Sequence, residues 1–459
     1  MLRDGILPYS IKKYTNMSKR ERWHEIYTNL WFTPILYAFL SFILIAVTMM
    51  LDFSFGAGQA VSPFLSVSSQ LTNTIVSTLT TAILSVSTFT FNSILVVFTT
   101  FSGQFSPRVL KNFIANKATQ RVLGIFTGSF LYVVICFFFI DTQSTSKFFT
   151  IPLTAICLAV LSAGTFIFFI NHSVKWLQVN HMTENMKAES VNIIQNSLQQ
   201  ELDPYRVEET DAISAEFPEC PGHQVVAPRS GYIQVVDFIN LIEEAKKDNL
   251  LIKMEVKVGD YNYASTPMLK YWKKDASTVD EYKYQKLISV GKHQTEIQDI
   301  EFSINKLVEV AIRSLGNNDP KTAINTIYQI GDLLVLISQI GYFAPYLKDK
   351  CGELRIILKD LSFEDYLHVG FGCIRHYSRD NVLITIEMLK ALKLMAQSIH
   401  PNHYQSLWDF AAGTAEGLES DWLFNFDNRL FYKALFDLAE ITKNEHEYKK
   451  LKQKVSCEV

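Results

Sequence analysis

The stretch TIVSTLTTAILSVSTFTFNSILVVFTTF, residues 74–101, decides what kind of protein this is. It contains no charged side chain, and the charge-free region around it extends from Phe53 to Pro107. A helix of about 20 apolar residues crosses the roughly 30 Å hydrocarbon core of a bilayer. The stretch is therefore long enough to span a membrane, although it is unusually rich in serine and threonine.

Three further apolar runs lie nearby, at residues 30–51, 122–140 and 148–171. Buried helices of a water-soluble protein seldom give several uncharged runs of this length. We therefore predict a four-helix transmembrane domain at residues 30–171, preceded by a cytoplasmic segment at residues 1–29.

Basic residues flank these runs unevenly. Those on the basic side are Lys12, Lys13, Lys19, Arg20 and Arg22 before the first run, Arg108, Lys111, Lys117 and Arg121 between the second and third, and Lys175 and Lys187 after the fourth. The other two connections carry only Lys147. Because positive residues favour the cytoplasmic side, both termini and everything after the fourth span are expected there.

The net charge, the cysteines and the N-terminal segment argue against several classes of protein. The formal charge of the 459-residue chain is −3, which gives no general attraction to nucleic acid. None of the six cysteines forms a Cys-x-x-Cys pair, so neither a disulfide framework nor a zinc ribbon is expected. About 30 largely polar residues precede the first apolar run, too many for an ordinary cleavable signal peptide.

A polar stripe runs along the second predicted span. Its members repeat every three or four residues and fall on one helix face: Thr74, Thr78, Thr81, Ser85, Thr88, Asn92 and Thr99. Small hydroxyl residues let helices approach closely, so the stripe could be a packing seam, which is the commoner arrangement. Alternatively, several copies could surround a wet, uncharged pore. No ionisable residue falls inside the predicted spans, which argues against a proton-coupled pump.

The chain leaves the second span through Ser106, Pro107 and Arg108. A proline beside the membrane boundary could act as a hinge between span and soluble part. Arg108 could instead contact lipid headgroups at the start of an interfacial helix. Both interpretations remain open.

Residues 172–228 read as a connecting helix and a proline-containing linker. Residues 229–275 then show the pattern Gly-Tyr-Ile, Val-Lys-Val-Gly-Asp-Tyr and Thr-Pro-Met-Leu, similar to the small β-barrel of biotinyl and lipoyl domains. Those domains carry a modified lysine at a hairpin tip, whereas a helix with Lys246 and Lys247 occupies that place here. We therefore expect a structural module rather than a carrier domain.

Residues 276–459 change to a 3.6-residue period and predict a cytoplasmic domain of five or six helices. Between two of these helices, Asn318, Asp319 and Pro320 form a loop that could cap a helix start or hold an anion. The predicted fold class is thus a membrane protein of mixed α+β type.

No catalytic constellation is recognisable in the soluble part. Cys373, His376 and Asp380 could imitate a nucleophile and its base, but a spacing of two turns along one helix is usually coincidence. His400 and His403 have no nearby carboxylate or thiol to complete a metal site. No phosphate-binding glycine motif occurs. We therefore expect neither an enzyme nor a cofactor.

Several motifs in order carry a family resemblance. They are Leu30-Trp-Phe-Thr-Pro34, Gln104-Phe-Ser-Pro-Arg108, Leu123-Gly-Ile-Phe-Thr-Gly-Ser-Phe-Leu-Tyr132, Ser230-Gly-Tyr-Ile233, Gln298-Asp-Ile-Glu-Phe302 and Asn318-Asp-Pro-Lys-Thr-Ala323. Together they resemble the bacterial predicted membrane proteins called domain of unknown function 2254, over nearly the whole chain. The resemblance implies a bacterial inner-membrane protein and supplies no activity.

Two functional hypotheses follow. The first is a homo-oligomeric channel or pore-like protein in which the second span lines the axis and the cytoplasmic domain regulates it. The alternative is a membrane-anchored scaffold or sensor that binds a cytoplasmic partner or small ligand of unknown identity. The lipid bilayer is an expected partner of either.

Overall fold

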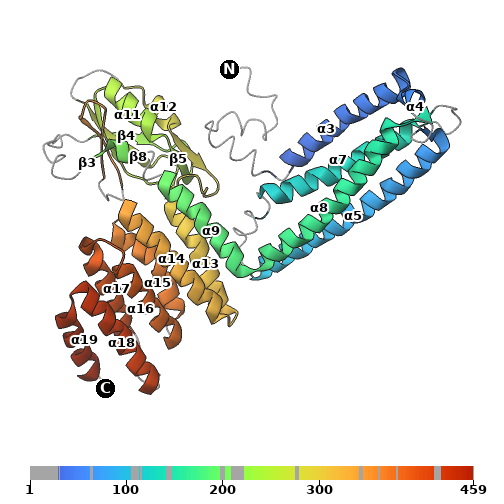
Figure 1. Ribbon diagram of the computed structural model, residues 1–459. Coiled ribbons are helices and arrows are strands. Elements are labelled where there is room, and N and C mark those ends of the chain that lie inside the picture. Colours follow the sequence, from blue (N-terminus) through green and yellow to red (C-terminus); the bar gives the residue numbers. More distant parts are fainter. Residues whose placement is uncertain are drawn as a thin grey trace. The chain divides into compact units, whose positions relative to one another are not determined.

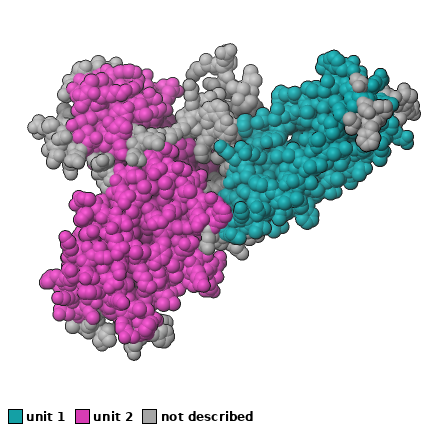
Figure 2. Space-filling view, in the orientation of Figure 1, with its two compact units in different colours: residues 1–179 teal, residues 180–459 magenta. Residues whose placement is uncertain are grey.

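A computed structural model describes residues 29, 31–61, 66–104, 113, 116–140, 147–196, 202–207, 222–273, 279–340, 345–359, 362–378, 381–417 and 425–457. The chain divides into two compact units, residues 1–179 and 180–459, which Figure 2 shows in teal and magenta. Unit 1 is almost wholly helical, whereas unit 2 combines helices with two sheets.

Four long helices build unit 1, labelled in Figure 1. They are α3 (Phe32–Met49), α5 (Ser69–Gln104), α7 (Lys117–Phe139) and α8 (Thr150–Leu177). The short helix α4 (Ala57–Ala60) and the two-residue strands β1 (Val67–Ser68) and β2 (Lys147–Phe148) lie in the connections. β1 and β2 pair antiparallel, which ties together the connections before α5 and before α8.

Helix α7 is the centre of unit 1, because it packs against α3, α5 and α8. Half of its most apolar window is buried, compared with 22–28% for the other three helices. Two glycines one turn apart allow α3 to approach closely. A Cβ at Gly124 would lie 2.6 Å from the Tyr37 ring, and one at Gly128 would lie 3.1 Å from the Tyr37 carbonyl oxygen. This is the small-xxx-small packing typical of membrane helices.

The end of α3 differs from the sequence-based prediction. The helix continues through a π-helical turn, Met50–Ser54, and so takes in Asp52, which the prediction had left outside the first span. The buried Asp52 carboxylate accepts hydrogen bonds from the backbone N–H groups of Phe149, Thr150 and Ile151 at 3.2, 3.1 and 2.8 Å. It therefore caps the N-terminus of α8, where a negative charge is favoured.

Five described helices are long and apolar enough to cross a membrane. Four are in unit 1, and their bounds differ from the predicted runs mainly because polar residues continue the helices past the apolar part. The fifth is α14 (Pro320–Ile340) in unit 2, which packs against α13, α15 and α16. More than half of its apolar window is buried there, as expected for a core helix.

Two sheets form the β part of unit 2. The six-stranded sheet has the order β3 (Arg206–Val207), β10 (Tyr346–Lys348), β11 (Leu354–Ile357), β6 (Leu250–Met254), β8 (Pro267–Lys273) and β4 (His223–Val226). Only the β11–β6 pair is parallel among them. The three-stranded sheet has the order β7 (Tyr261–Asn262), β5 (Gly231–Val236) and β9 (Ile288–Gly291).

One hydrophobic core joins the two sheets with helix α11 (Phe238–Lys247). Ile252 and Leu269 contribute from the larger sheet, Ile233 and Val290 from the smaller, and Leu241 from the helix. The strands come from residues 206–357, so residues 229–275 are too narrow a boundary for this module. The six-residue helix α12 (Glu281–Lys286) completes it.

The remaining helices of unit 2 pack on one another. They are α9 (Val179–Ile194), α13 (Ile300–Gly316), α14, α15 (Phe363–Tyr377), α16 (Val382–Ala396), α17 (Tyr404–Glu416), α18 (Asn425–Thr442) and α19 (Glu445–Cys457). From Ile300 onward the described residues thus form seven α-helices, more than the five or six predicted, and strands β10 and β11 interrupt them. Figure 1 shows α9 running beside α13.

Candidate functional site

The polar stripe of α5 faces outward from unit 1. Every member predicted to line a pore (Thr74, Thr78, Thr81, Ser85, Thr88 and Asn92) is exposed, and so is Thr99. The described residues of α5 that are buried form a different set: Ser69, Thr72, Val76, Ile83, Ser87, Thr90, Ile94 and Val97. The stripe is therefore not a packing seam within one copy of unit 1.

The two sets lie on opposite faces of α5. Each residue turns an α-helix by about 100°, so Ile83 and Asn92 lie about 180° apart around the axis. The buried face packs against α7 and α8. Large apolar side chains flank the stripe, and Phe89, Leu95 and Val96 are all exposed. The stripe is thus a narrow polar strip on an otherwise apolar outer surface.

The hydroxyl groups of the stripe bond within their own helix. Thr81 Oγ1 donates to the carbonyl of Ser77 at 3.3 Å, Ser85 Oγ to Thr81 at 2.9 Å, and Thr88 Oγ1 to Leu84 at 2.9 Å. This back-bonding satisfies a hydroxyl donor without water. The side-chain amide of Asn92 differs, because no described residue lies within hydrogen-bonding distance of it.

The predicted membrane-exit residues Ser106, Pro107 and Arg108 lie outside the described residues, so the hinge and headgroup interpretations stay predictions. The described chain includes Asn116, whose side chain accepts from the Ala118 N–H at 2.8 Å and caps the start of α7.

The loop at Asn318, Asp319 and Pro320 connects α13 to α14. Asn318 has φ +57°, the left-handed conformation that often ends a helix, and the Asp319 N–H donates to the Ser314 carbonyl at 2.9 Å. Asp319 Oδ1 accepts from the Thr322 N–H at 3.2 Å, and Pro320 occupies the first position of α14. The geometry is that of a helix stop followed by a helix start, while anion binding stays an untested prediction.

The histidines considered in unit 2 have local roles. His400 Nδ1 accepts from the Asn402 N–H at 3.4 Å, and the His403 ring lies 4.5 Å from that of Phe363. Burial, with His400 nearby, holds the pKa of His403 below its usual range. Cys373 and His376 are both on α15, and Asp380 lies outside the described residues.

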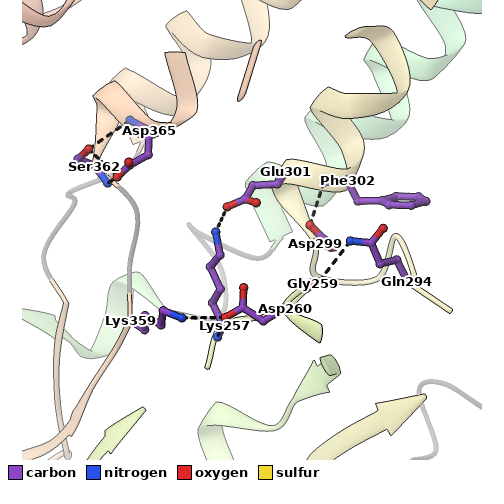
Figure 3. A network of polar contacts seen from close by, with 10 residues as sticks. All are labelled: Lys257, Gly259, Asp260, Gln294, Asp299, Glu301, Phe302, Lys359, Ser362 and Asp365. Atoms are coloured by element: carbon purple, nitrogen blue, oxygen red, sulfur yellow. Dashed lines mark hydrogen bonds and ion pairs between the residues drawn. The ribbon is translucent and has the colours of Figure 1, made fainter. Parts of the chain in front are cut away.

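A junction that the sequence did not reveal lies at the start of α13, where this helix meets the sheets (Figure 3). The Gln298 side chain bonds the backbone of Val236 on β5 twice, with its Oε1 accepting at 2.9 Å and its Nε2 donating at 3.1 Å. Gln294 Nε2 donates to the Gly259 carbonyl at 3.2 Å. These contacts fix the N-terminal end of α13 to the end of β5 and to the turn between β6 and β7.

Asp299 is the most unusual member of this junction. It is only 2% exposed, and its Oδ1 accepts from the Phe302 N–H at 2.8 Å as the N-cap of α13. Its Oδ2 is buried and accepts no hydrogen bond from the described residues. Gly259, with φ +93°, lies so close that any Cβ there would overlap Oδ2. A buried oxygen without a donor disfavours the ionised carboxyl.

The charges around Asp299 reinforce this effect. The pKa of Asp299 is raised to about 7, mainly by burial, with Glu301 and Asp260 adding to the rise and the Phe302 N–H and Lys257 opposing it. Lys257 pairs with Glu301, and Lys359 Nζ lies 3.0 Å from Asp260 Oδ2 (Figure 3). Each lysine thus already pairs with a carboxylate other than that of Asp299.

The same helix connects the junction to α9. Lys306 is fully buried, with its Nζ 2.8 Å from Glu296 and 3.2 Å from Glu189 on α9. Ser190 Oγ lies 3.5 Å from the Ser303 carbonyl. The first two turns of α13 therefore contact both the β6–β7 turn and α9, the helix that begins directly after α8.

Comparison with known proteins identifies the family. The profile described as "Predicted membrane protein (DUF2254)" matches residues 27–394. The chain belongs to this family. The family membership agrees with the several apolar helices of unit 1, and its description names no activity.

The relatives add no function. An uncharacterized protein of Mycobacterium tuberculosis strain H37Rv is 27% identical over 311 residues, which cover 65% of this chain and 58% of the relative. An uncharacterized protein of Mycobacterium bovis matches to the same extent. The chain thus spans less than two thirds of the length of these relatives. No solved structure is significantly similar to it.

Proposed function

We propose that the protein forms a homo-oligomeric, pore-like assembly in the bacterial inner membrane, with α5 of each copy facing a central axis. The observation that carries the proposal is the orientation of the stripe, which is exposed along α5 on the face opposite the one that packs. A polar strip on the outer surface of a membrane helix needs either water or another protein surface against it.

Asn92 is the residue of the stripe that most needs a polar partner. It lies about 8 Å from the midpoint of α5, well within a hydrocarbon core about 30 Å thick. An amide without a hydrogen-bond partner costs several kcal/mol in an apolar medium, on the order of 2–7 kcal/mol. Water in a pore, or Asn92 of neighbouring copies, would satisfy it.

The proposed arrangement has four spans, the unit 1 helices α3, α5, α7 and α8, with both termini in the cytoplasm. The basic flanks support this orientation. In this arrangement α14 is a core helix of the cytoplasmic part, and the two sheets are an assembly module related to small biotinyl-like folds. Lys246 and Lys247, which contact Cys351 and Glu244, then have structural roles rather than carrying a cofactor.

A membrane-anchored scaffold is the second candidate. Exposed apolar side chains on the helical part of unit 2 favour it, namely Leu383, Leu394 and Phe426. A scaffold would bind a cytoplasmic partner through such residues and would conduct nothing. Neither candidate is an enzyme, and neither requires a cofactor.

Cross-linking tests the orientation directly. In a full-length variant that keeps only the buried Cys136 of the six cysteines, Ser85→Cys should cross-link between copies with a short bis-maleimide in membranes. Leu84→Cys, exposed on the neighbouring face, is the matched control and should cross-link far less. Equal cross-linking yields from the two positions would show that the stripe of α5 does not face a central axis.

A further inference from the structure

We infer that the start of α13 and the Gly259 turn form a proton-binding site at which Asp299 holds one proton, and that release of this proton loosens the contact between turn and helix. The inference concerns unit 2 alone. It goes beyond the proposed pore and stands whether or not ions pass through the membrane part.

The charged groups around Asp299 are already paired with one another. The charged groups that face Asp299 are Glu301 on its own helix and Lys257 and Asp260 on the β6–β7 turn, with Lys359 beside Asp260. Lys257 pairs with Glu301 and Lys359 pairs with Asp260, so these four charges balance. A charge on Asp299 would add one uncompensated negative charge to a buried site. The neutral acid leaves the cluster balanced.

The two carboxyl oxygens of Asp299 also differ in their hydrogen bonds. Oδ1 of Asp299 has the Phe302 N–H as a donor, whereas Oδ2 has no donor among the described residues and faces Gly259. Glycine is required there, because φ is +93° and a Cβ would overlap Oδ2. An ionised Oδ2 would be driven toward solvent, and the adjacent turn would have to move to admit water.

The consequence reaches beyond the turn. Gln294 and Gln298 fix the same end of α13 to Gly259 and Val236, and Lys306 two turns later contacts Glu189 of α9. A shift of the N-terminal end of α13 therefore acts on α9. Because Lys306 on α13 pairs with Glu189 on α9, the proton site is placed to make this part of unit 2 responsive to pH.

The direct test is infrared titration of the full-length protein in detergent. The wild-type protein should show the carbonyl band of a protonated carboxyl that disappears with a midpoint near pH 7, and Asp299→Asn should lack it. Asn caps a helix about as well as Asp, so the variant keeps α13. Asp319→Asn, which changes the exposed N-cap of α14, is the matched control and should keep the band. A wild-type protein without a band that titrates between pH 5 and 8 would overturn the inference.

Hydrogen exchange measured by mass spectrometry tests the movement. After correction for intrinsic rates, peptides covering residues 256–262 and 296–304 should exchange faster at pH 8 than at pH 6 in the wild type and in Asp319→Asn. In Asp299→Asn the two pH values should give the same protection. If the wild type is equally protected at both values, proton release does not loosen the junction and the second half of the inference is wrong.

Discussion

Two helices of unit 1 carry small residues at helical spacing, and they use them in opposite ways. On α7, Gly124 and Gly128 face inward and bring Tyr37 of α3 into contact. On α5, the serine and threonines of the stripe face outward, opposite the packed face: Thr74, Thr78, Thr81, Ser85, Thr88 and Thr99. Small residues that face inward serve the fold of one copy, whereas those that face outward remain available for a second copy or for water.

The largest effect is expected at α7. Gly124→Leu would drive a side chain into the Tyr37 ring and should cost about 3 kcal/mol of the free energy of unfolding, the upper part of the usual range for overpacking. The melting temperature in detergent would report this loss. Gly164→Leu on α8 is the matched control, because nothing lies within 4 Å of its Cβ, and it should have little effect. If both variants lose similar amounts of stability, the close contact between α3 and α7 is not what makes Gly124 important.

Asp52 also makes contacts inside unit 1, so its replacement should destabilise the fold, as replacement of Gly124 should. Asp52→Asn removes the charge that three N–H groups at the start of α8 share, and hydrogen bonds to charged groups contribute about 1.5–3 kcal/mol. We expect a loss of about 2 kcal/mol, measured by thermal or denaturant unfolding. An unchanged stability would mean that Asp52 is not needed as the cap of α8.

A bulky residue on the outer stripe should spare the fold and disturb assembly. Ser85→Leu lies on the exposed face of α5, so we expect a change in stability of a single copy within about 0.5 kcal/mol. Mass photometry in nanodiscs should show fewer oligomers. Val160→Leu, also exposed but on α8, should leave the oligomer distribution unchanged. A Ser85→Leu protein that fails to fold would contradict the outward orientation.

The smallest structural change separates a polar pore from a seam between copies. Thr81→Val keeps the shape and removes a hydroxyl that already bonds to the Ser77 carbonyl, so both folding and assembly should be nearly unaffected. In a pore the lost polarity should lower conductance, whereas a seam depends mainly on shape and would be indifferent. Conductance and oligomer content should therefore be measured on the same sample.

Long uncharged runs predicted the four long helices of unit 1, because a membrane span must be long and apolar. Periodicity located the stripe on one face of α5. It could not say whether that face is inside or outside, since small polar residues suit both environments. The role of Asp52 was missed because its partners, the N–H groups at the start of α8, are far away in the chain.

The junction in unit 2 shows a different limit. Both halves of it, the Val-Lys-Val-Gly-Asp turn and the Gln298–Phe302 segment, stand out in the sequence as separate motifs. The contact between these two segments forms only in the folded protein, and so does the burial that makes Asp299 unusual. The short strands β10 and β11 were missed for a similar reason, because three or four residues give too little alternation to detect.

The most direct test of the pore is single-channel recording from the purified protein in liposome patches, with and without membrane tension. The account predicts discrete openings whose conductance falls in Asn92→Leu, because this change removes the exposed amide of the stripe. Silence from a well-folded wild-type oligomer, or openings that Asn92→Leu leaves unchanged, would contradict the proposal that α5 lines a pore.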